Sequence, residues 1–112
     1  MQLTFRKTNT TMVVSISGEL DHHNAVSIRE EIDRRFSVSS AKNLVFNLKS
    51  LRFMDSSGLG ILIGRYKTVS ATGGKTSIAA PTQNAERLIN LAGINRIIPV
   101  YRTVDEAVGG DK

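Results

Sequence analysis

Residues 44–70 read LVFNLKSLRFMDSSGLGILIGRYKTVS, and the hydrophobic pattern changes its period within this run. Residues 44–48 are apolar enough for a strand that is buried on both faces. Residues 51–57 carry the polar groups typical of a loop. From residue 57 or 58 to about residue 70 the apolar side chains recur every three or four positions, which predicts a helix. A buried strand that passes through a loop into a helix predicts the α/β class.

The segments on the N-terminal side add a hairpin and another helix. Residues 3–7 and 12–17 alternate apolar and polar side chains around a turn cluster at residues 8–10, and we expect Gly18 to end the second strand. Residues 24–36 change to helical spacing, with an apolar stripe that leaves most charges on the other side. The chain is therefore expected to begin with two antiparallel strands that lead into a helix.

The segments on the C-terminal side continue the alternation. Residues 76–80 predict a strand, and residues 81–92 predict a helix with Gly93 at its C-terminal stop. Residues 97–100 predict a short last strand. The capping-box spacing S/T-x-x-E at residues 103–106 predicts a final helix.

Length and composition suit a single domain. The 112 residues are enough for one hydrophobic core and leave little room for two, so we expect one domain over residues 1–112. Hydrophobic residues make up 40% of the chain and are mostly aliphatic, which predicts an aliphatic core. Together the segments predict an α/β domain with a mixed β-sheet, an initial hairpin and about four helices.

Composition also argues against several functions. The chain has no cysteine, so disulfides, thiolate metal sites and cysteine nucleophiles are excluded. No apolar run approaches the roughly 20 residues of a membrane helix, and the N-terminus lacks the apolar core of a signal peptide. We therefore expect a soluble, cytoplasmic protein without a membrane partner. The net charge of +5 is scattered along the chain, which predicts a solvated basic surface and no direct nucleic-acid site.

The polar turn Phe-Met-Asp-Ser-Ser-Gly-Leu-Gly at residues 53–60 is the strongest candidate site. It joins a strand to a helix, at the edge where open α/β sheets usually bind ligands. Ser56 or Ser57 could serve as the helix N-cap, but two serines and Asp55 are more polar groups than one cap requires. A phosphate on Ser57 would meet free N–H groups and the positive end of the helix dipole. The turn is therefore either a plain helix cap or a functional site at which a phosphate on Ser57 would be stabilised.

The helix after this turn carries a second candidate feature. Its apolar side chains cluster on one side, and Ile61 falls nearly opposite them between Gly60 and Gly64, so Ile61 is predicted to face solvent. Glycine in an exposed helix costs about 1 kcal/mol against alanine, which suggests that another surface approaches the backbone closely. We expect a partner to dock here. The alternative is that the two glycines allow tight packing of the helix on the sheet.

The segment Gly-Glu-Leu-Asp-His-His at residues 18–23 is the third feature. Neighbouring side chains point in different directions in both strands and helices, so His22 and His23 do not form a chelate, and no metal site is predicted. Asp21 or Asn24 is expected to cap the following helix. Alternatively, this loop lies beside the Ser57 loop and completes a surface that binds a partner protein.

Three segments together resemble the anti-sigma factor antagonists of the STAS domain family: residues 18–23, residues 53–60, and Gly-Arg-Tyr-Lys at residues 64–67. The similarity covers nearly the whole chain, and the family has the same order of elements. The resemblance implies that Ser57, the second serine of Asp-Ser-Ser-Gly, is the phosphate acceptor. It also implies a surrounding loop and partner surface made of Asp21, His22, His23, Asp55, Ser56 and Gly58.

The resemblance implies partners and a mechanism as well. The unphosphorylated protein binds an anti-sigma factor that is also a serine kinase, and so releases the sigma factor. The kinase uses ATP to phosphorylate Ser57, which breaks the complex, and a PP2C-type phosphatase restores it. The chain itself is then expected to be no enzyme and to hold no cofactor. A monomer is expected, because the sequence has no heptads and no obvious second apolar face.

Two alternatives stay open. A stress-response antagonist of the same family is one, although the double histidine at residues 22–23 favours the sporulation type. A serine hydrolase is the other, with Ser57 as nucleophile and a histidine as base. The nucleophile elbow needs glycine two residues before the serine, where Asp55 stands. The glycine-rich motifs of nucleotide-binding loops are also absent from the sequence.

Overall fold

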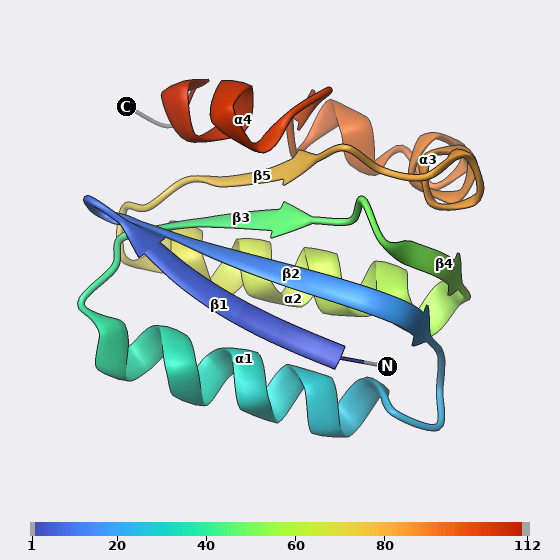
Figure 1. Cartoon of the computed structure of the whole chain (residues 1–112), viewed down its shortest axis with the longest axis horizontal. Helices are drawn as coiled ribbons and strands as arrows, with labels where there is room; N and C mark the ends of the chain where they lie inside the picture. The colour runs from blue at the N-terminus through green and yellow to red at the C-terminus, as the bar shows by residue number, and fades with distance from the viewer. Residues whose placement is uncertain (1, 111–112) are drawn as a thin grey trace.

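A computed structural model describes residues 2–110, in which strands and helices alternate along most of the chain (Figure 1). The elements in chain order are β1 (Gln2–Thr8), β2 (Thr11–Leu20), α1 (Ala25–Ser39), β3 (Asn43–Asn47), β4 (Leu51–Met54), α2 (Ser56–Ala71), β5 (Thr76–Ala79), α3 (Gln83–Leu91), the 3-10 turn η1 (Ile94–Arg96), β6 (Val100–Tyr101) and α4 (Val104–Gly110). The α/β class and the four α-helices expected from the sequence are confirmed within these residues.

The strands form one mixed sheet with the order β1-β2-β3-β5-β6. β1 and β2 pair antiparallel, which confirms the predicted hairpin. The pairs β2–β3, β3–β5 and β5–β6 are parallel. β4 lies off this path and pairs in parallel with residues 18–20 of β2.

The helices cover the two faces of the sheet unequally. α1 and α2 lie beside each other on one face, and α4 covers part of the other (Figure 1). The larger core lies under α1 and α2, where Ile32, Leu62 and Phe46 are fully buried. A smaller cluster lies under α4 and consists of Val13, Val45, Ala79 and Ala107.

The end of β2 and the segment that follows β3 differ from the expectation. β2 does not end at Gly18 but continues to Leu20, with a φ of 89° at Gly18 and an irregular register beside it. Residues 51–54 were expected to be a loop and instead form β4, with Leu51 and Met54 buried in the core. The prediction was wrong because β4 depends on pairing with a distant segment, which leaves no local periodic pattern.

The last strand also lies elsewhere than expected. α3 ends as predicted, with Gly93 beyond it at a φ of 75°. The carbonyl of Ile94 then accepts the N–H groups of Ile97 at 2.9 Å and Ile98 at 2.8 Å. This turn occupies the start of the predicted strand at residues 97–100, so β6 begins only at Val100.

The capping box predicted for the final helix is confirmed. Thr103 Oγ1 accepts the N–H of Glu106 at 3.1 Å, and Glu106 Oε1 accepts the N–H of Thr103 at 3.2 Å. These reciprocal bonds satisfy two N–H groups at the start of α4.

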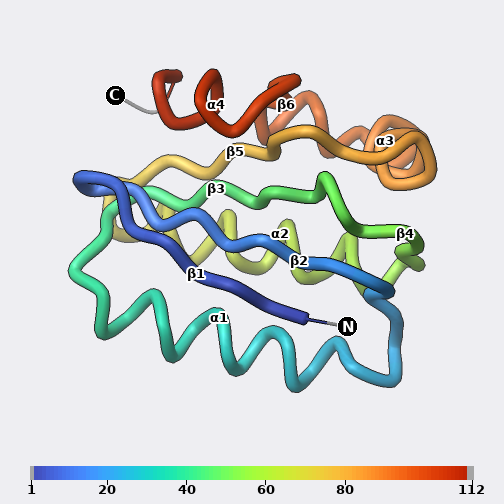
Figure 2. Tube along the Cα trace, in the orientation of Figure 1, coloured from blue at the N-terminus to red at the C-terminus, as the bar shows by residue number. Residues whose placement is uncertain are grey.

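The fold brings the two candidate segments to one edge. β2 and β4 end, and α1 and α2 begin, at the same end of the molecule (Figure 2). Residues 18–23 and 53–60 therefore meet there. Within residues 2–110, no helix combines the length and the hydropathy needed to span a bilayer.

Candidate functional site

Asp55 links the two candidate segments. It follows β4 and is the N-cap of α2, where its Oδ1 accepts the N–H of Ser57 at 2.8 Å. Its Oδ2 accepts the N–H of His22 at 3.3 Å, and its own N–H donates to the carbonyl of Leu20 at 3.2 Å. One residue therefore ties the loop after β2 to the first turn of α2.

Neither serine caps the helix, so the alternative in which Ser56 or Ser57 is the N-cap is wrong. α2 begins at Ser56, slightly earlier than predicted, which puts both serines inside the first turn. A carboxylate suits the cap because it accepts an N–H and interacts favourably with the positive end of the helix dipole. Ser56 is exposed and Ser57 is half-buried, and neither hydroxyl is needed for the cap.

The pKa of the Asp55 carboxyl lies below its ordinary value of 3.8. Burial favours the neutral acid and opposes this shift, but hydrogen bonds from the backbone N–H groups of Ser57 and His22 stabilise the charged form and outweigh it. The Ser57 hydroxyl and the His22 ring act in the same direction to a smaller extent. Asp55 is therefore a fixed negative charge beside Ser57 at neutral pH.

The loop between β2 and α1 is held by its own side chains. Asp21 Oδ1 accepts the N–H of His23 at 2.9 Å, and Asn24 Oδ1 accepts the N–H of Asp21 at 3.0 Å. Asn24 Nδ2 donates to the carbonyl of Glu19 at 2.9 Å. Asn24 is the N-cap residue of α1, which agrees with one of the two residues expected there, but its side chain makes no capping hydrogen bond. These side chains stabilise the loop itself.

The two histidines form the outer part of this edge. Their ring centroids are 4.0 Å apart, and their side chains are 71% and 78% exposed. Nδ1 of His22 lies 3.7 Å from Oδ2 of Asp55, and Nδ1 of His23 lies 3.6 Å from Oδ1 of Asp21. The loop of residues 21–23 thus adjoins the Ser57 loop, which confirms that part of the prediction. Among residues 2–110, no three His, Asp or Glu side chains converge as metal ligands.

Ser57 lines a groove of about 360 Å³ between α1 and α2. The lining residues are Ala25, Val26, Arg29, Ser57, Gly60, Ile61, Gly64 and Arg65. A Cβ added at Gly60 or Gly64 would meet nothing within 4 Å, so these glycines do not serve tight packing on the sheet. Gly58 serves that role, because a Cβ there would overlap the side chain of Met54. The two later glycines instead leave the groove open.

Ile61 is only 4% exposed, so the prediction that it faces solvent was wrong. It belongs to the main core cluster. The helical period gives the angle between side chains of α2 but does not tell which element lies on each side. Because α1 packs beside α2, the side assigned to solvent is largely covered.

Sequence reasoning missed two arginines of this groove. Arg65 is 8% exposed, and its Nε lies 2.8 Å from Oδ1 of Asp33. Its Nη1 is buried without a hydrogen-bond partner among residues 2–110. Burial lowers the pKa of Arg65, the charge of Asp33 raises it in part, and the charge of Arg29 lowers it further. The available signal was an arginine one helical turn after Ile61, on the same side of α2.

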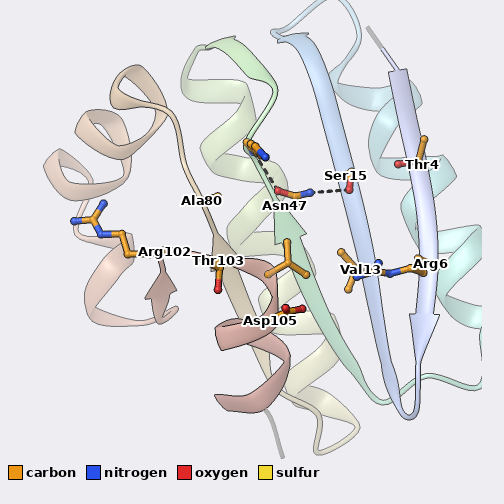
Figure 3. Close-up of a pocket in the computed structure, with 11 residues that line it drawn as sticks. Thr4, Arg6, Val13, Ser15, Asn47, Ala80, Arg102, Thr103 and Asp105 are labelled. Carbon is orange, nitrogen blue, oxygen red and sulfur yellow. Dashed lines mark hydrogen bonds between the residues drawn. The ribbon is translucent and has the colours of Figure 1, made fainter.

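A larger hollow of about 560 Å³ lies on the opposite face of the sheet, between α4 and the first two strands (Figure 3). Its floor includes Asn47, whose Nδ2 donates to Oγ of Ser15 at 3.0 Å. Its basic lining residues are Arg6, Lys49 and Arg102. No residue of the predicted site lines this hollow, so the candidate site is defined by the convergence of the two sequence segments at Ser57 and not by the size of a cavity.

The sequence and the fold are both similar to those of known proteins. Residues 2–107 match the family model of the STAS domain. An anti-sigma F factor antagonist from Paenibacillus polymyxa is 35% identical over 101 residues, which cover 90% of this chain and 86% of that protein.

Two solved structures have the same fold. The anti-sigma factor antagonist SpoIIAA in its unphosphorylated form has a TM-score of 0.82 and 29% identity, and the match covers 96% of this chain and 93% of that one. The Bacillus cell fate determinant SpoIIAA in the phosphorylated form has a TM-score of 0.76 and 28% identity, with coverage of 99% and 100%.

The match over nearly all of the chain includes both candidate segments. The chain belongs to the STAS domain family and, within it, to the anti-sigma factor antagonists. Antagonists of this class are regulatory proteins that bind an anti-sigma factor.

Proposed function

We propose that this chain antagonises an anti-sigma factor that is also a serine kinase, and that phosphorylation of Ser57 switches the antagonism off. The unphosphorylated form binds the anti-sigma factor and releases the sigma factor. Ser57 Oγ then takes the γ-phosphoryl group of ATP and loses its proton, and ADP is released from the kinase. Hydrolysis by a PP2C-type phosphatase returns the hydroxyl. The chain supplies the acceptor and the docking surface and no catalytic group.

The position of Ser57 carries this proposal. Its N–H is already bonded to Asp55, it is half-buried in the first turn of α2, and it lines the groove beside an exposed loop. A kinase can reach a hydroxyl at such an edge without unfolding the helix. A phosphate there would lie at the centre of the proposed docking surface, where it would affect the affinity for the partner most.

The docking surface has an outer part and a support. We propose that the partner contacts the loop residues Asp21, His22, His23, Asp55 and Ser56. Gly60 and Gly64 leave room for the partner beside α2, because nothing fills the space where their side chains would be. Gly58 and Ile61 are buried and support this surface from beneath.

Charge and desolvation explain how the phosphate would end binding. It adds about −1.5 to −2 charges at pH 7 beside the carboxylate of Asp55. The partner would have to desolvate both groups in the complex. A cost of about 2.8 kcal/mol is enough for a loss of affinity of roughly 100-fold.

The relatives support the same assignment. The Paenibacillus polymyxa protein is named an antagonist of the anti-sigma F factor, and SpoIIAA has been solved in unphosphorylated and phosphorylated forms. We extend to this chain both the sporulation-type partner and the switch between two forms. The protein is then cytoplasmic, and ATP acts only as the substrate of the partner kinase.

Phosphate mapping tests the acceptor. We expect incubation with ATP and the anti-sigma kinase from the same cell to add one phosphate, on Ser57 only, by intact mass and peptide mapping. Ser57→Ala should take up none, and Ser56→Ala should be phosphorylated like the wild type. A phosphate on Ser56, or none on the wild type, would overturn the proposal.

Calorimetry tests the switch and the partner. Ser57→Ala should bind the kinase as tightly as the unphosphorylated wild type, and Ser57→Asp should bind at least about tenfold more weakly, which corresponds to 1.4 kcal/mol. Equal affinities of the two variants would contradict the electrostatic explanation. Binding only to a kinase of the stress-response type would replace the sporulation assignment with the alternative.

A further inference from the structure

The groove beside Ser57 contains more positive than negative charge. Arg29 and Arg65 both line it, and Asp33 is the carboxylate paired with Arg65. Arg29 takes part in no ion pair among residues 2–110 and lies near enough to Arg65 to lower its pKa. Like charges held together in this way favour an anion between or beside them.

Arg29 and Ser57 lie on two neighbouring helices and line the same groove. α1 and α2 begin at the same edge and run side by side in the same direction (Figure 1). Side chains of a helix lean toward its N-terminus and cover the preceding turn. Arg29 stands one helical turn after Ala25, which lines the groove with Ser57. Arg29 and Ser57 therefore line the same groove from two facing helices, and the general tilt of helical side chains favours an approach of Arg29 toward Ser57.

The chemistry of the two arginines fits a phosphate. A guanidinium binds phosphate oxygens through two parallel N–H bonds, which a single ammonium charge does not reproduce. Arg65 is nine-tenths buried, and its Nη1 has no hydrogen-bond partner among residues 2–110. Arg65 therefore adds a positive charge with an unused N–H donor, deeper in the groove than the more exposed Arg29.

We propose that the groove between α1 and α2 is a receptor in cis for the phosphate on Ser57, with Arg29 binding its oxygens and Arg65 supplying charge behind it. The proposal rests on the proposed function only in taking Ser57 as the residue that carries a phosphate. The groove is open at Gly60 and Gly64 and has room for the phosphate group. The phosphorylated side chain then occupies part of the groove, so phosphorylation changes the docking surface by occupation as well as by repulsion.

The pKa of the phosphate reports this contact. The charged and titratable groups at this edge and groove are Asp21, Asp33 and Asp55, His22 and His23, and the two arginines from α1 and α2. The carboxylates raise the second pKa of the phosphate, which is ordinarily about 6, and the arginines lower it. A titration that isolates Arg29 therefore tests the receptor directly.

The experiment uses protein in which phosphoserine is installed at position 57 during translation, followed by ³¹P NMR from pH 4 to 9. Arg29→Gln should raise the pKa of the phosphate by about 1 unit relative to the wild type. Arg29→Lys should retain part of the lowering. Arg34→Gln is the matched control, because it removes the same charge from an exposed position of α1 that is paired with Glu31. The wild-type and Arg29→Gln titrations are repeated with His22→Gln and His23→Gln also present, so that the effect of Arg29 is measured without the two neighbouring rings.

The outcomes are distinct. An unchanged phosphate pKa in Arg29→Gln, or an equal change in Arg34→Gln, would overturn the receptor. Amide spectra of each variant confirm that it is folded before the comparison is made. The installed phosphoserine does not depend on any kinase, so the titration tests the phosphate receptor by itself. If the kinase fails to phosphorylate Ser57, the proposed function is overturned, but the result of the titration still stands.

Discussion

Asp55 joins the two segments that meet at this edge. Its two oxygens accept N–H groups from different segments, Ser57 at 2.8 Å and His22 at 3.3 Å. Both N–H groups would need new partners if the carboxylate were removed. The cap and the position of the histidine loop are thus coupled through one side chain.

Replacing this side chain should destabilise the domain. We expect Asp55→Ala to lower the free energy of unfolding by about 1–2 kcal/mol, because the cap of α2 is lost. Urea denaturation followed by circular dichroism measures this change. Ser56→Ala, at an exposed neighbour, is the control and should change stability by less than about 0.5 kcal/mol. If Asp55→Ala changed the free energy of unfolding as little as Ser56→Ala does, the cap would contribute nothing to stability.

The same residue predicts a dependence of stability on pH. The pKa of Asp55 is lower in the folded state than its ordinary value of 3.8, so its contribution is complete above that value. The contribution is lost as the pH falls through the folded-state pKa. The difference in unfolding free energy between the wild type and Asp55→Asn should therefore be largest above about pH 5 and shrink below about pH 4. A difference that stays constant from pH 7 to pH 3 would contradict this assignment.

At the scale of the element, α2 uses its first glycines in two ways. A Cβ at Gly58 would overlap Met54 and lie 3.2 Å from Leu20, whereas a Cβ at Gly60 would meet nothing within 4 Å. The first glycine permits close packing on β4 and the end of β2. The second keeps the groove beside α1 open.

Alanine substitutions should separate these two roles. Gly58→Ala should destabilise the domain by about 1–3 kcal/mol, because the added methyl group forces buried neighbours to move. Gly60→Ala should stabilise it by up to about 1 kcal/mol, since alanine is the better helix former and its side chain has room. Chemical denaturation of the matched pair checks both signs. Loss of stability in both variants would show that the groove does not have the space described.

At the scale of the whole molecule, a net charge of +5 opposes self-association of the domain. The large exposed hydrophobic side chains belong to several elements. Phe53 on β4 and Leu91 on α3, two elements in contact, are 46% and 78% exposed. If two copies associated, we would expect the contact between them to include these two residues.

We expect the protein to be a monomer of 12.2 kDa. Sedimentation equilibrium at several concentrations and at physiological salt, where charge repulsion is partly screened, measures the mass directly. A dimer that forms as concentration rises, and that Leu91→Glu abolishes, would contradict the prediction and identify α3 as the contact.

The local pattern of residues was sufficient for most of the fold and for the centre of the site. The hairpin at the N-terminus, the four helices and the capping box at Thr103 follow from periodicity and turn chemistry, which act over a few neighbouring residues. The same local signals identified the crowded turn that carries Ser57. Its resemblance to a family then supplied the expected phosphorylation, which stays a prediction.

Contacts between distant segments determined the rest. β4 exists because residues 51–54 pair with the end of β2, Ile61 is buried because α1 lies beside α2, and Asp55 caps α2 while it holds the histidine loop. Arg29 and Ser57 likewise line one groove from two different helices. Periodicity describes one segment at a time, so it specifies which elements form. Which of their faces are covered, and which charges meet, depends on how those elements pack.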